Sequence, residues 1–307
     1  MQQCQICNCI EDFDLVEDNK IIGLPSEMQG SFIEFKGKNN IIFFDESVVL
    51  EDTTVRFFGD NNVVFFSSGG RYKIRAKVDV FNNSVFYMGK NCDTTRVIRA
   101  VLSEGKHIII GNDCLFSFGI WFRNSDPHLI YDGSSMERIN MSKSVFIGDH
   151  VWIGQDAFVS KGTKIGSGAI VGAKCVTGGR ILNSNCSYAG VPGKAVRENI
   201  FWLRPCVHSY KQAQTKSSMC YKNKEFLYSN DENCLSFDTI DKEIDRLTSS
   251  EERFDYLKKT IFENDNKNRF YVHNEQPKPT LLSRIFRRNN EASSPLIETL
   301  SDFWLIC

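Results

Sequence analysis

An aliphatic residue returns at every sixth position in the middle of the chain, and this period constrains the fold more than any other feature. The five registered positions are Ile147, Ile153, Val159, Ile165 and Val171, and a glycine or serine follows each of them. A period of six matches neither the 3.6-residue helix nor the two-residue strand. It fits a three-sided coil with six residues on each side, stacked on its neighbours by parallel β hydrogen bonds. The sequence therefore predicts an all-β fold, a parallel β-helix.

The same repeat continues upstream in a looser form. Residues 37–44 read GKNNIIFF and are echoed by residues 59–66, GDNNVVFF. The offset corresponds to one coil of three six-residue sides plus a few residues inserted at the corners. Asparagine tolerates the positive φ of tight corners, and we expect Asn62 and Asn83 to stack as an amide ladder. The pattern divides the chain into an N-terminal segment (1–30), a β-helix domain (31–198) and a C-terminal extension (199–307).

A polar stretch interrupts the coil over residues 123–144. It carries Pro127 and Gly133, and the six-residue register resumes only after it. Long loops in compact folds are uncommon and usually functional. We therefore expect a loop insertion that contributes to a binding or catalytic site.

Helical patterns replace the β pattern beyond Pro192. Ser249 and Glu252 form a capping box ahead of apolar residues at helical spacing, and a shorter apolar pattern covers residues 240–247. The extension is therefore predicted to be partly α-helical. Residues 281–288 are basic and amphipathic, and they either make a weak peripheral contact with a membrane or capsule-assembly complex or dock on the protein itself.

Composition argues against several classes of protein. Lys and Arg number 37 against 38 Asp and Glu, so the net charge of −1 gives no general attraction to nucleic acid. No stretch approaches the roughly 20 apolar residues of a membrane-spanning helix. The start, Met1 to Cys4, lacks the regions of a secretory signal, and the 11 scattered cysteines favour reduced thiols over a disulfide framework. We expect a cytoplasmic protein. If residues 281–288 contact lipid, we expect it at the inner face of the membrane.

Three motifs carry a resemblance to a known family. Residues 148–154 read GDHVWIG, residues 188–194 read YAGVPGK, and the loop contains RNSDPHLIY at 123–131. Together they resemble the left-handed β-helix (hexapeptide-repeat) acetyltransferases, and within them the bacterial capsule and polysialic acid O-acetyltransferases. Gly193 stands where the family commonly has alanine. The resemblance is close over 105–202 and loose over 31–104, and it does not reach residues 203–307.

The resemblance implies a left-handed coil, a homotrimer with active sites at the subunit seams, and direct transfer of acetyl from acetyl-CoA to a hydroxyl. A sugar hydroxyl needs a general base near neutral pH, and histidine suits that role. His128 lies in the loop and matches the family's catalytic histidine. Asp126 either orients the His128 ring or is a turn residue beside Pro127.

Trp152 matches the tryptophan that lines the acetyl and pantetheine channel in similar enzymes, and packing between subunits is its alternative role. Gly154, Gly172 and Ala173 are small enough to border a narrow CoA channel, although the coil itself also needs small residues there. Lys194 is the expected contact of the adenosine phosphates of CoA.

Three loop residues are candidates for holding the acceptor. Arg123, Tyr131 and Arg138 suit the carboxylate and hydroxyls of an acidic sugar, because arginine binds carboxylates in a bidentate manner. The alternative is that these side chains are solvated on the loop surface and have no binding role. No metal is expected, because Cys4 and Cys7 have no second cysteine pair at zinc-site spacing.

The sequence predicts an acetyl-CoA-dependent O-acetyltransferase that acts on a bacterial capsular polysaccharide, with an acidic, sialic-acid-type polymer as the expected acceptor. One alternative is acetylation of a small acceptor such as a xenobiotic, a nucleotide-sugar or serine. The other is a non-catalytic β-helix that serves as a scaffold.

Overall fold

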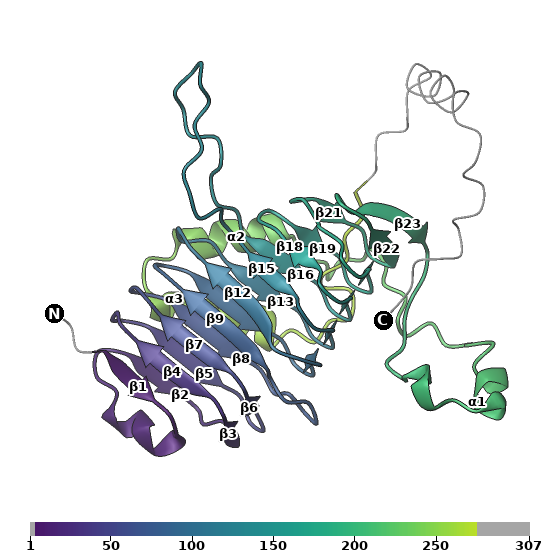
Figure 1. Cartoon of the computed structure of the whole chain (residues 1–307), viewed down its shortest axis with the longest axis horizontal. Coiled ribbons are helices and arrows are strands. Elements are labelled where there is room, and N and C mark those ends of the chain that lie inside the picture. Colours follow the sequence, from purple (N-terminus) through teal and green to yellow (C-terminus); the bar gives the residue numbers. More distant parts are fainter. Residues whose placement is uncertain (1–3, 275–307) are drawn as a thin grey trace.

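A computed structural model describes residues 4–274, and it shows stacked three-sided β coils followed by a helical extension (Figure 1). Three sheets form the sides of the coils, and strands that are neighbours in a sheet belong to successive coils. The chain is a left-handed parallel β-helix with a partly helical extension, which confirms the predicted fold class.

The first sheet consists of β1 (Gln5–Cys7), β4 (Phe32–Phe35), β7 (Thr54–Phe57), β9 (Ala76–Val80), β12 (Ile98–Leu102), β15 (Trp121–Arg123) and β18 (Phe158–Val159). The second sheet consists of β2 (Lys20–Ile22), β5 (Ile41–Phe44), β8 (Val63–Phe66), β10 (Val85–Met88), β13 (Ile108–Ile110), β16 (Val145–Ile147), β19 (Lys164–Ile165) and β21 (Ile181–Leu182). The third sheet consists of β11 (Asp93–Thr94), β14 (Leu115–Phe116), β17 (Trp152–Ile153), β20 (Ile170–Val171), β22 (Cys186–Ala189) and β23 (Lys194–Glu198). In the earliest coils the pair β3 (Glu27–Gln29) and β6 (Val49–Glu51) occupies the third side.

The β-helix begins at Lys20 rather than at residue 31. Strand β2 pairs in parallel with β5, and β3 pairs with β6, so the first coil lies within the predicted N-terminal segment. The sequence pattern missed it because β2 and β3 are only three residues long and lack the Gly-x-Asn-Asn corner of the next two coils. At the other end β23 turns back antiparallel to β22 and ends at Glu198.

Coil length changes along the axis. Phe86 pairs with Val64 and with Ile108, each 22 residues away, whereas Phe146 pairs with Lys164, 18 residues away. The echo between residues 37–44 and 59–66 is confirmed, because β5 and β8 pair in register from Ile41–Val63 to Phe44–Phe66. The loose upstream repeat is thus a wider coil of the same kind.

Asparagines stack at the corners, but not in the predicted pair. The Nδ2 of Asn62 donates to Oδ1 of Asn40 at 2.8 Å, and Asn40 in turn donates to Oδ1 of Asn19 at 2.9 Å; Asn62 and Asn40 are buried and Asn19 is half-buried. Asn83 accepts instead from Asn61, at 2.8 Å, on the exposed part of the corner. The predicted Asn62–Asn83 pair is therefore wrong by one residue, because one position separates an inward amide from an outward one.

Two apolar clusters hold the chain together. One fills the interior of the coils with inward residues such as Ile33, Val55, Val78 and Phe122. The other lies between the outer face of the second sheet and the extension, where Phe65 and Tyr87 pack against Phe254 and Leu257. The central strands β8, β10, β13 and β16 of the second sheet are thus buried on both faces.

The extension supplies the helical part of the fold. Its helices are α1 (Gln212–Ser217), α2 (Phe237–Arg246), α3 (Ser250–Leu257) and a π-helical turn η3 (Lys258–Phe262), with a short 3-10 turn η2 (Val207–Ser209); another 3-10 turn, η1 (Ile10–Leu15), lies near the N-terminus. Both helices predicted from the sequence are present, and Ser249 and Glu252 form the expected capping box. Among residues 4–274 no helix has the length and apolar character needed to cross a bilayer. The basic segment 281–288 lies outside the described residues.

Candidate active site

A groove on the third sheet collects most of the residues predicted to bind CoA. Its volume is about 560 Å³, and Trp152, Gly154, Gly172 and Ala173 all line it. Trp152 points outward from β17 and is half-buried, and Ile170 is its register neighbour on β20. An aromatic ring beside small residues leaves backbone groups accessible to an extended ligand.

The two glycines of the groove differ in how strongly the coil requires them. A methyl group at Gly154 would lie 2.7 Å from the backbone nitrogen of Ala173, a distance at which the coil must shift. A methyl group at Gly172 would approach nothing closer than the Tyr188 carbonyl oxygen, at 3.2 Å. Gly154 is therefore required by the coil itself, whereas Gly172 keeps the groove open.

Lys174, and not Lys194, is the lysine that lines the groove. Lys194 lies on β23 opposite Ala189, one strand beyond β22, and its side chain is exposed. Lys174 follows Ala173 at the corner, with a φ of 58°. The sequence offered one signal for it, the position directly after two small residues of the repeat.

The inserted loop projects from the coils as a long narrow arm (Figure 1). Residues 124–144, called the loop arm from here on, fold back on themselves through a bridge between Tyr131 and Arg138. The backbone N–H groups of Ser134 and Ser135 donate to Oδ1 of Asp132 and close the tip. His128 and Tyr131 are both exposed on the arm, so they are available to molecules outside this chain.

Polar contacts fix the base of the loop arm. Lys161 Nζ lies 2.6 Å from Oδ2 of Asp126 and lowers the pKa of that carboxyl. Asn140 donates to the same carboxylate at 3.1 Å and to the His128 carbonyl oxygen at 2.7 Å. In the described structure Asp126 thus acts on His128 through the backbone, by way of Asn140, and makes no hydrogen bond to the ring.

The predicted acceptor-binding arginines have different surroundings. Arg138 forms a bidentate ion pair with Glu104, at 2.7 and 2.9 Å, which lowers the pKa of Glu104 to about 2. Arg123 on β15 is half-buried, and its Nε is enclosed without a hydrogen-bond partner among the described residues. Arg138 therefore holds the arm against the coil, and Arg123 retains donor capacity.

The loop arm and the groove lie at different corners of the coil. The arm connects β15 of the first sheet to β16 of the second, whereas the groove is on the third sheet and the corner that follows it. Residues of the arm are absent from the lining of the groove. A single chain therefore does not bring His128 to Trp152.

One family of known proteins matches part of the coils. Residues 144–179 match the family described as "Bacterial transferase hexapeptide (six repeats)". Over these residues the chain is similar to hexapeptide-repeat transferases, and this matched segment is called the hexapeptide-repeat domain from here on. The match includes the GDHVWIG segment at 148–154, with Trp152, and falls on the regular 18-residue coils.

Two polysialic acid O-acetyltransferases are similar in sequence to the chain. The protein of Neisseria meningitidis is 45% identical over 108 residues, and that of Escherichia coli O1:K1 / APEC is 39% identical over 104 residues. These matches cover 35% and 34% of this chain and 50% and 34% of the relatives. The matched segment thus spans half or less of each curated relative.

Two crystal structures are similar over a longer range. The polySia-specific acetyltransferase NeuO superposes with a TM-score of 0.57 and 27% identity, covering 65% of this chain and 93% of that one. The polysialic acid O-acetyltransferase OatWY superposes with a TM-score of 0.52 and 25% identity, covering 65% and 94%. Both are similar to this chain over nearly their whole length.

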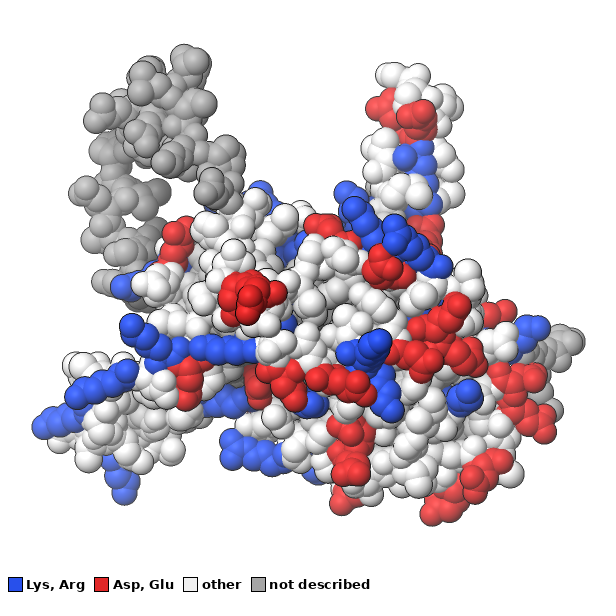
Figure 2. Space-filling model, turned by 180° about the vertical axis from the view of Figure 1, so that it is seen from behind, with Lys and Arg blue, Asp and Glu red and all other residues white. Residues whose placement is uncertain are grey.

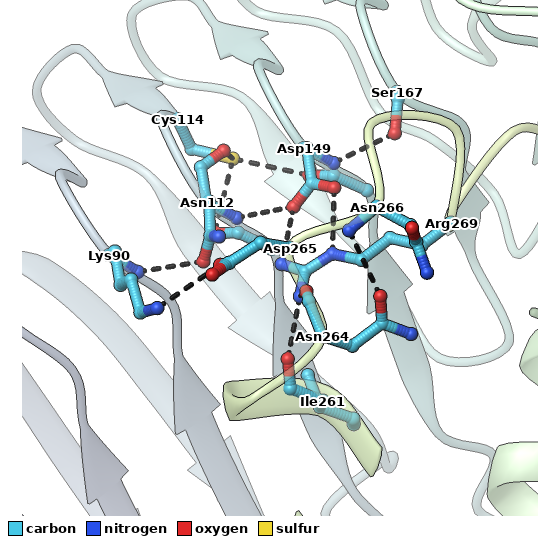
Figure 3. A network of polar contacts seen from close by, with 12 residues as sticks. Lys90, Asn112, Cys114, Asp149, Ser167, Ile261, Asn264, Asp265, Asn266 and Arg269 are labelled. Atoms are coloured by element: carbon cyan, nitrogen blue, oxygen red, sulfur yellow. Dashed lines mark hydrogen bonds and ion pairs between the residues drawn. The ribbon is translucent and has the colours of Figure 1, made fainter. Parts of the chain in front are cut away.

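Within the hexapeptide-repeat domain, Asp149 and His150 anchor the extension instead of lining the groove. Arg269 forms a buried bidentate ion pair with Asp149, at 2.8 and 2.9 Å, and Figure 3 shows this pair at the centre of a polar network. The His150 ring lies between Trp202 and Phe226, with both centroids 4.2 Å away. Burial lowers the pKa of His150 to about 4, so this ring is neutral at pH 7 and has a structural role.

His107 also has a structural role. It is buried beside Asp241 and Asp245 in a grouping that resembles a metal site. However, Nδ1 accepts a hydrogen bond from the Val85 N–H at 3.2 Å, so Nε2 carries the proton and donates to Asp245 at 3.3 Å. That tautomer leaves no lone pair for a metal, and the histidine instead ties α2 to the second sheet.

Proposed function

We propose that this chain is an acetyl-CoA-dependent O-acetyltransferase whose acceptor is a hydroxyl of a capsular, polysialic-acid-type polysaccharide. The observation that carries the proposal is the groove beside Trp152, which is bordered by small residues and lies mostly within the hexapeptide-repeat domain. The similarity to polysialic acid O-acetyltransferases of two bacteria supports the acceptor class.

His128 is the proposed general base. It removes the proton from the acceptor hydroxyl as that oxygen attacks the carbonyl carbon of the acetyl group. The same imidazolium then returns the proton to the departing sulfur of CoA, so the products are the acetyl ester and CoA thiol. Trp152 forms the wall against which the acetyl and pantetheine portion lies, and Lys174 or Lys194 meets the phosphates.

The active site in this proposal is shared between subunits of a homotrimer. His128 and the groove lie at different corners of one chain, so the loop arm of one subunit must reach the groove of its neighbour. Exposure of the arm supports this arrangement, because its apolar side chains Leu129, Ile130 and Met136 are 60%, 48% and 74% exposed in the single chain. Arg123 and Tyr131 would then contact the acceptor near the seam.

A cytoplasmic location belongs to the same proposal. The ten cysteines among the described residues are all free thiols, which suits a reducing compartment. Acetyl-CoA acts as co-substrate, and the proposed chemistry requires no metal.

The first experiment measures CoA thiol release from acetyl-CoA with polysialic acid as acceptor. We expect His128→Ala to reduce turnover at least a hundredfold, within the range typical of general bases, while CoA affinity is unchanged. His208→Ala is the matched control, because His208 is exposed and lies outside both the loop arm and the lining of the groove. Full activity of His128→Ala would remove the assigned base.

A mixing experiment tests the shared site. Chains with His128→Ala and chains with Trp152→Ala are each inactive in the proposal, but mixed trimers contain seams with both native residues. Activity should therefore return when the two are co-expressed. If co-expression restores no activity, the site lies within one chain or the roles given to His128 and Trp152 are wrong.

The acceptor assay also separates the alternative functions. Transfer of acetyl to small acceptors alone would replace the polysaccharide with a small-molecule substrate, and absence of CoA binding would favour a scaffold.

A further inference from the structure

A cleft lined by two arginines and two tyrosines lies near the groove, where the extension crosses the third side of the coils. Its volume is about 740 Å³, and Arg71, Tyr72, Arg204 and Tyr221 are among its lining residues. A smaller recess of about 250 Å³ shares Arg71, Tyr72 and Arg204 and adds Asp93 and Leu115. We call the two together the arginine–tyrosine cleft.

The cleft contains one fixed and one available guanidinium. Arg204 donates to the carbonyl oxygens of Asn91 and Cys114, at 2.8 and 3.2 Å, and its Nη1 is buried without a hydrogen-bond partner in the described chain. Arg71 is exposed and makes one hydrogen bond, to the Tyr72 hydroxyl at 2.9 Å. Both guanidinium groups lie against the Tyr72 ring, with centroid distances of 5.1 Å for Arg71 and 4.6 Å for Arg204.

The cleft also contains carboxylates, and these limit the kinds of ligand that can bind there. Asp93, Asp113 and Glu225 border the cleft, and Glu225 accepts a hydrogen bond from the Tyr221 hydroxyl at 3.0 Å. Three carboxylates would repel a compact polyanion such as phosphate. A sugar with one carboxylate offers hydroxyls to these acceptors and its own charge to Arg71, while its apolar face can lie on a tyrosine ring.

A basic lobe beside the cleft adds long-range attraction for an anionic polymer. Residues 206–224, which carry α1, contain four lysines and no Asp or Glu. The lobe projects from the body of the protein, and in the rear view of Figure 2 it shows blue side chains without red ones. Positive charge of this kind speeds the capture of an anionic chain in a manner that salt weakens.

The cleft is aligned with the proposed reaction site. Asp93, Leu115 and Trp152 are register neighbours on β11, β14 and β17, so the recess begins one strand from Trp152, at Leu115, and extends to the second strand, at Asp93. Neighbouring strands are about 4.8 Å apart, which places the recess about 5 to 10 Å from Trp152. A short run of linked sugars can therefore occupy both places.

We propose that the arginine–tyrosine cleft is a non-catalytic subsite that binds an acidic sugar of the polysaccharide while another unit of the same polymer is acetylated at the groove. The proposal rests on the proposed function for its acceptor. It predicts that affinity rises with acceptor length, because only a longer oligomer reaches both sites.

The test uses the full chain and sialic acid oligomers of increasing length. Arg71→Gln should raise the Kd and the KM of the longer oligomers about tenfold, while kcat and the KM of a sialic acid monomer stay unchanged. Lys38→Gln is the matched control, since it removes the same charge from an exposed corner outside the cleft. Neutral dextran oligomers should bind with equal weakness to both variants and to the native protein.

The outcomes separate this inference from the proposed function. If polysialic acid is acetylated but Arg71→Gln matches Lys38→Gln in Kd and KM, the subsite is wrong and the transferase stands. If the native protein binds acidic oligomers in an Arg71-dependent manner without acetylating them, the transferase is wrong and the cleft stands. If the native protein binds no acidic oligomer, the subsite is overturned directly.

Discussion

The buried pair of Arg269 and Asp149 should account for much of the stability with which the extension is held on the coils. The side chains are 1% and 11% exposed, and Arg269 Nη1 also donates to the Ile261 carbonyl oxygen at 2.6 Å. Replacing Arg269 with methionine leaves the Asp149 charge uncompensated in a buried place, which typically costs about 3–5 kcal/mol. Asp149 keeps one donor, the Asn112 N–H at 2.6 Å, so we expect a loss near the lower end of that range.

Urea unfolding provides the measurement, followed by tryptophan fluorescence because Trp202 is stacked on His150 where the extension meets the coils. Limited proteolysis should show earlier cleavage between residues 199 and 274. Arg246→Met is the control, since the pair of Arg246 with Glu243 is exposed and such pairs contribute only about 0–1 kcal/mol.

A second substitution isolates the cause. Adding Asp149→Asn to Arg269→Met should recover part of the lost stability, because the amide oxygen still accepts from Asn112 while the buried charge is gone. If Arg269→Met is no more destabilising than Arg246→Met, the reasoning from the buried charge is refuted.

Three other predictions concern the groove and the anchor. Lys174→Gln should weaken CoA binding several-fold in equilibrium titrations, and Lys194→Gln should weaken it less, because of these two lysines Lys174 lines the groove. A larger effect of Lys194→Gln would instead support Lys194 as the contact of the CoA phosphates. Gly154→Ala should lower the thermal midpoint, whereas Gly172→Ala should fold normally and bind CoA more weakly, and equal behaviour would contradict their separate roles. Burial lowers the pKa of His150 from 6.5 to about 4, so the neutral ring stabilises the fold above pH 6.5 and up to about 3 kcal/mol is lost as the pH falls to about 4. The urea midpoint of His150→Asn should therefore lack the fall that His150 causes between pH 6.5 and about 4. A pH profile identical to that of the native protein would contradict this assignment.

The sequence was most informative where each residue's role is repeated. Five hexads in register predict the coil, and the pairing of Phe146 with Lys164 bears out their 18-residue spacing. The runs IIFF at 41–44 and VVFF at 63–66 carried a further signal. A strand that is apolar on both faces needs cover on both. Those runs therefore indicated that something outside the coil packs on the second sheet, and α3 does so.

Contacts between distant segments could not be predicted in the same way. Arg269 lies 120 residues beyond Asp149, and no local pattern marks an isolated arginine as the partner of one particular aspartate. The loop insertion was visible as a break in register, but its anchor Lys161 comes from the next coil. Lys174 lines the groove and Lys194 does not, because Lys194 lies on β23, which turns back antiparallel to β22. The six-residue repeat does not predict this reversal of the chain.

The segment GDHVWIG joins the groove to the extension. Asp149 and His150 face the extension, and two residues later Trp152 faces the groove, because the corner at His150 turns the chain with a φ of 53°. Trp202 contacts both sides of this turn, stacking on His150 at 4.2 Å and lying 6.0 Å from Trp152. A change that loosens the extension therefore removes support from the wall of the groove. On this reasoning Arg269→Met should weaken CoA binding as well as stability, even though Arg269 lies outside the groove.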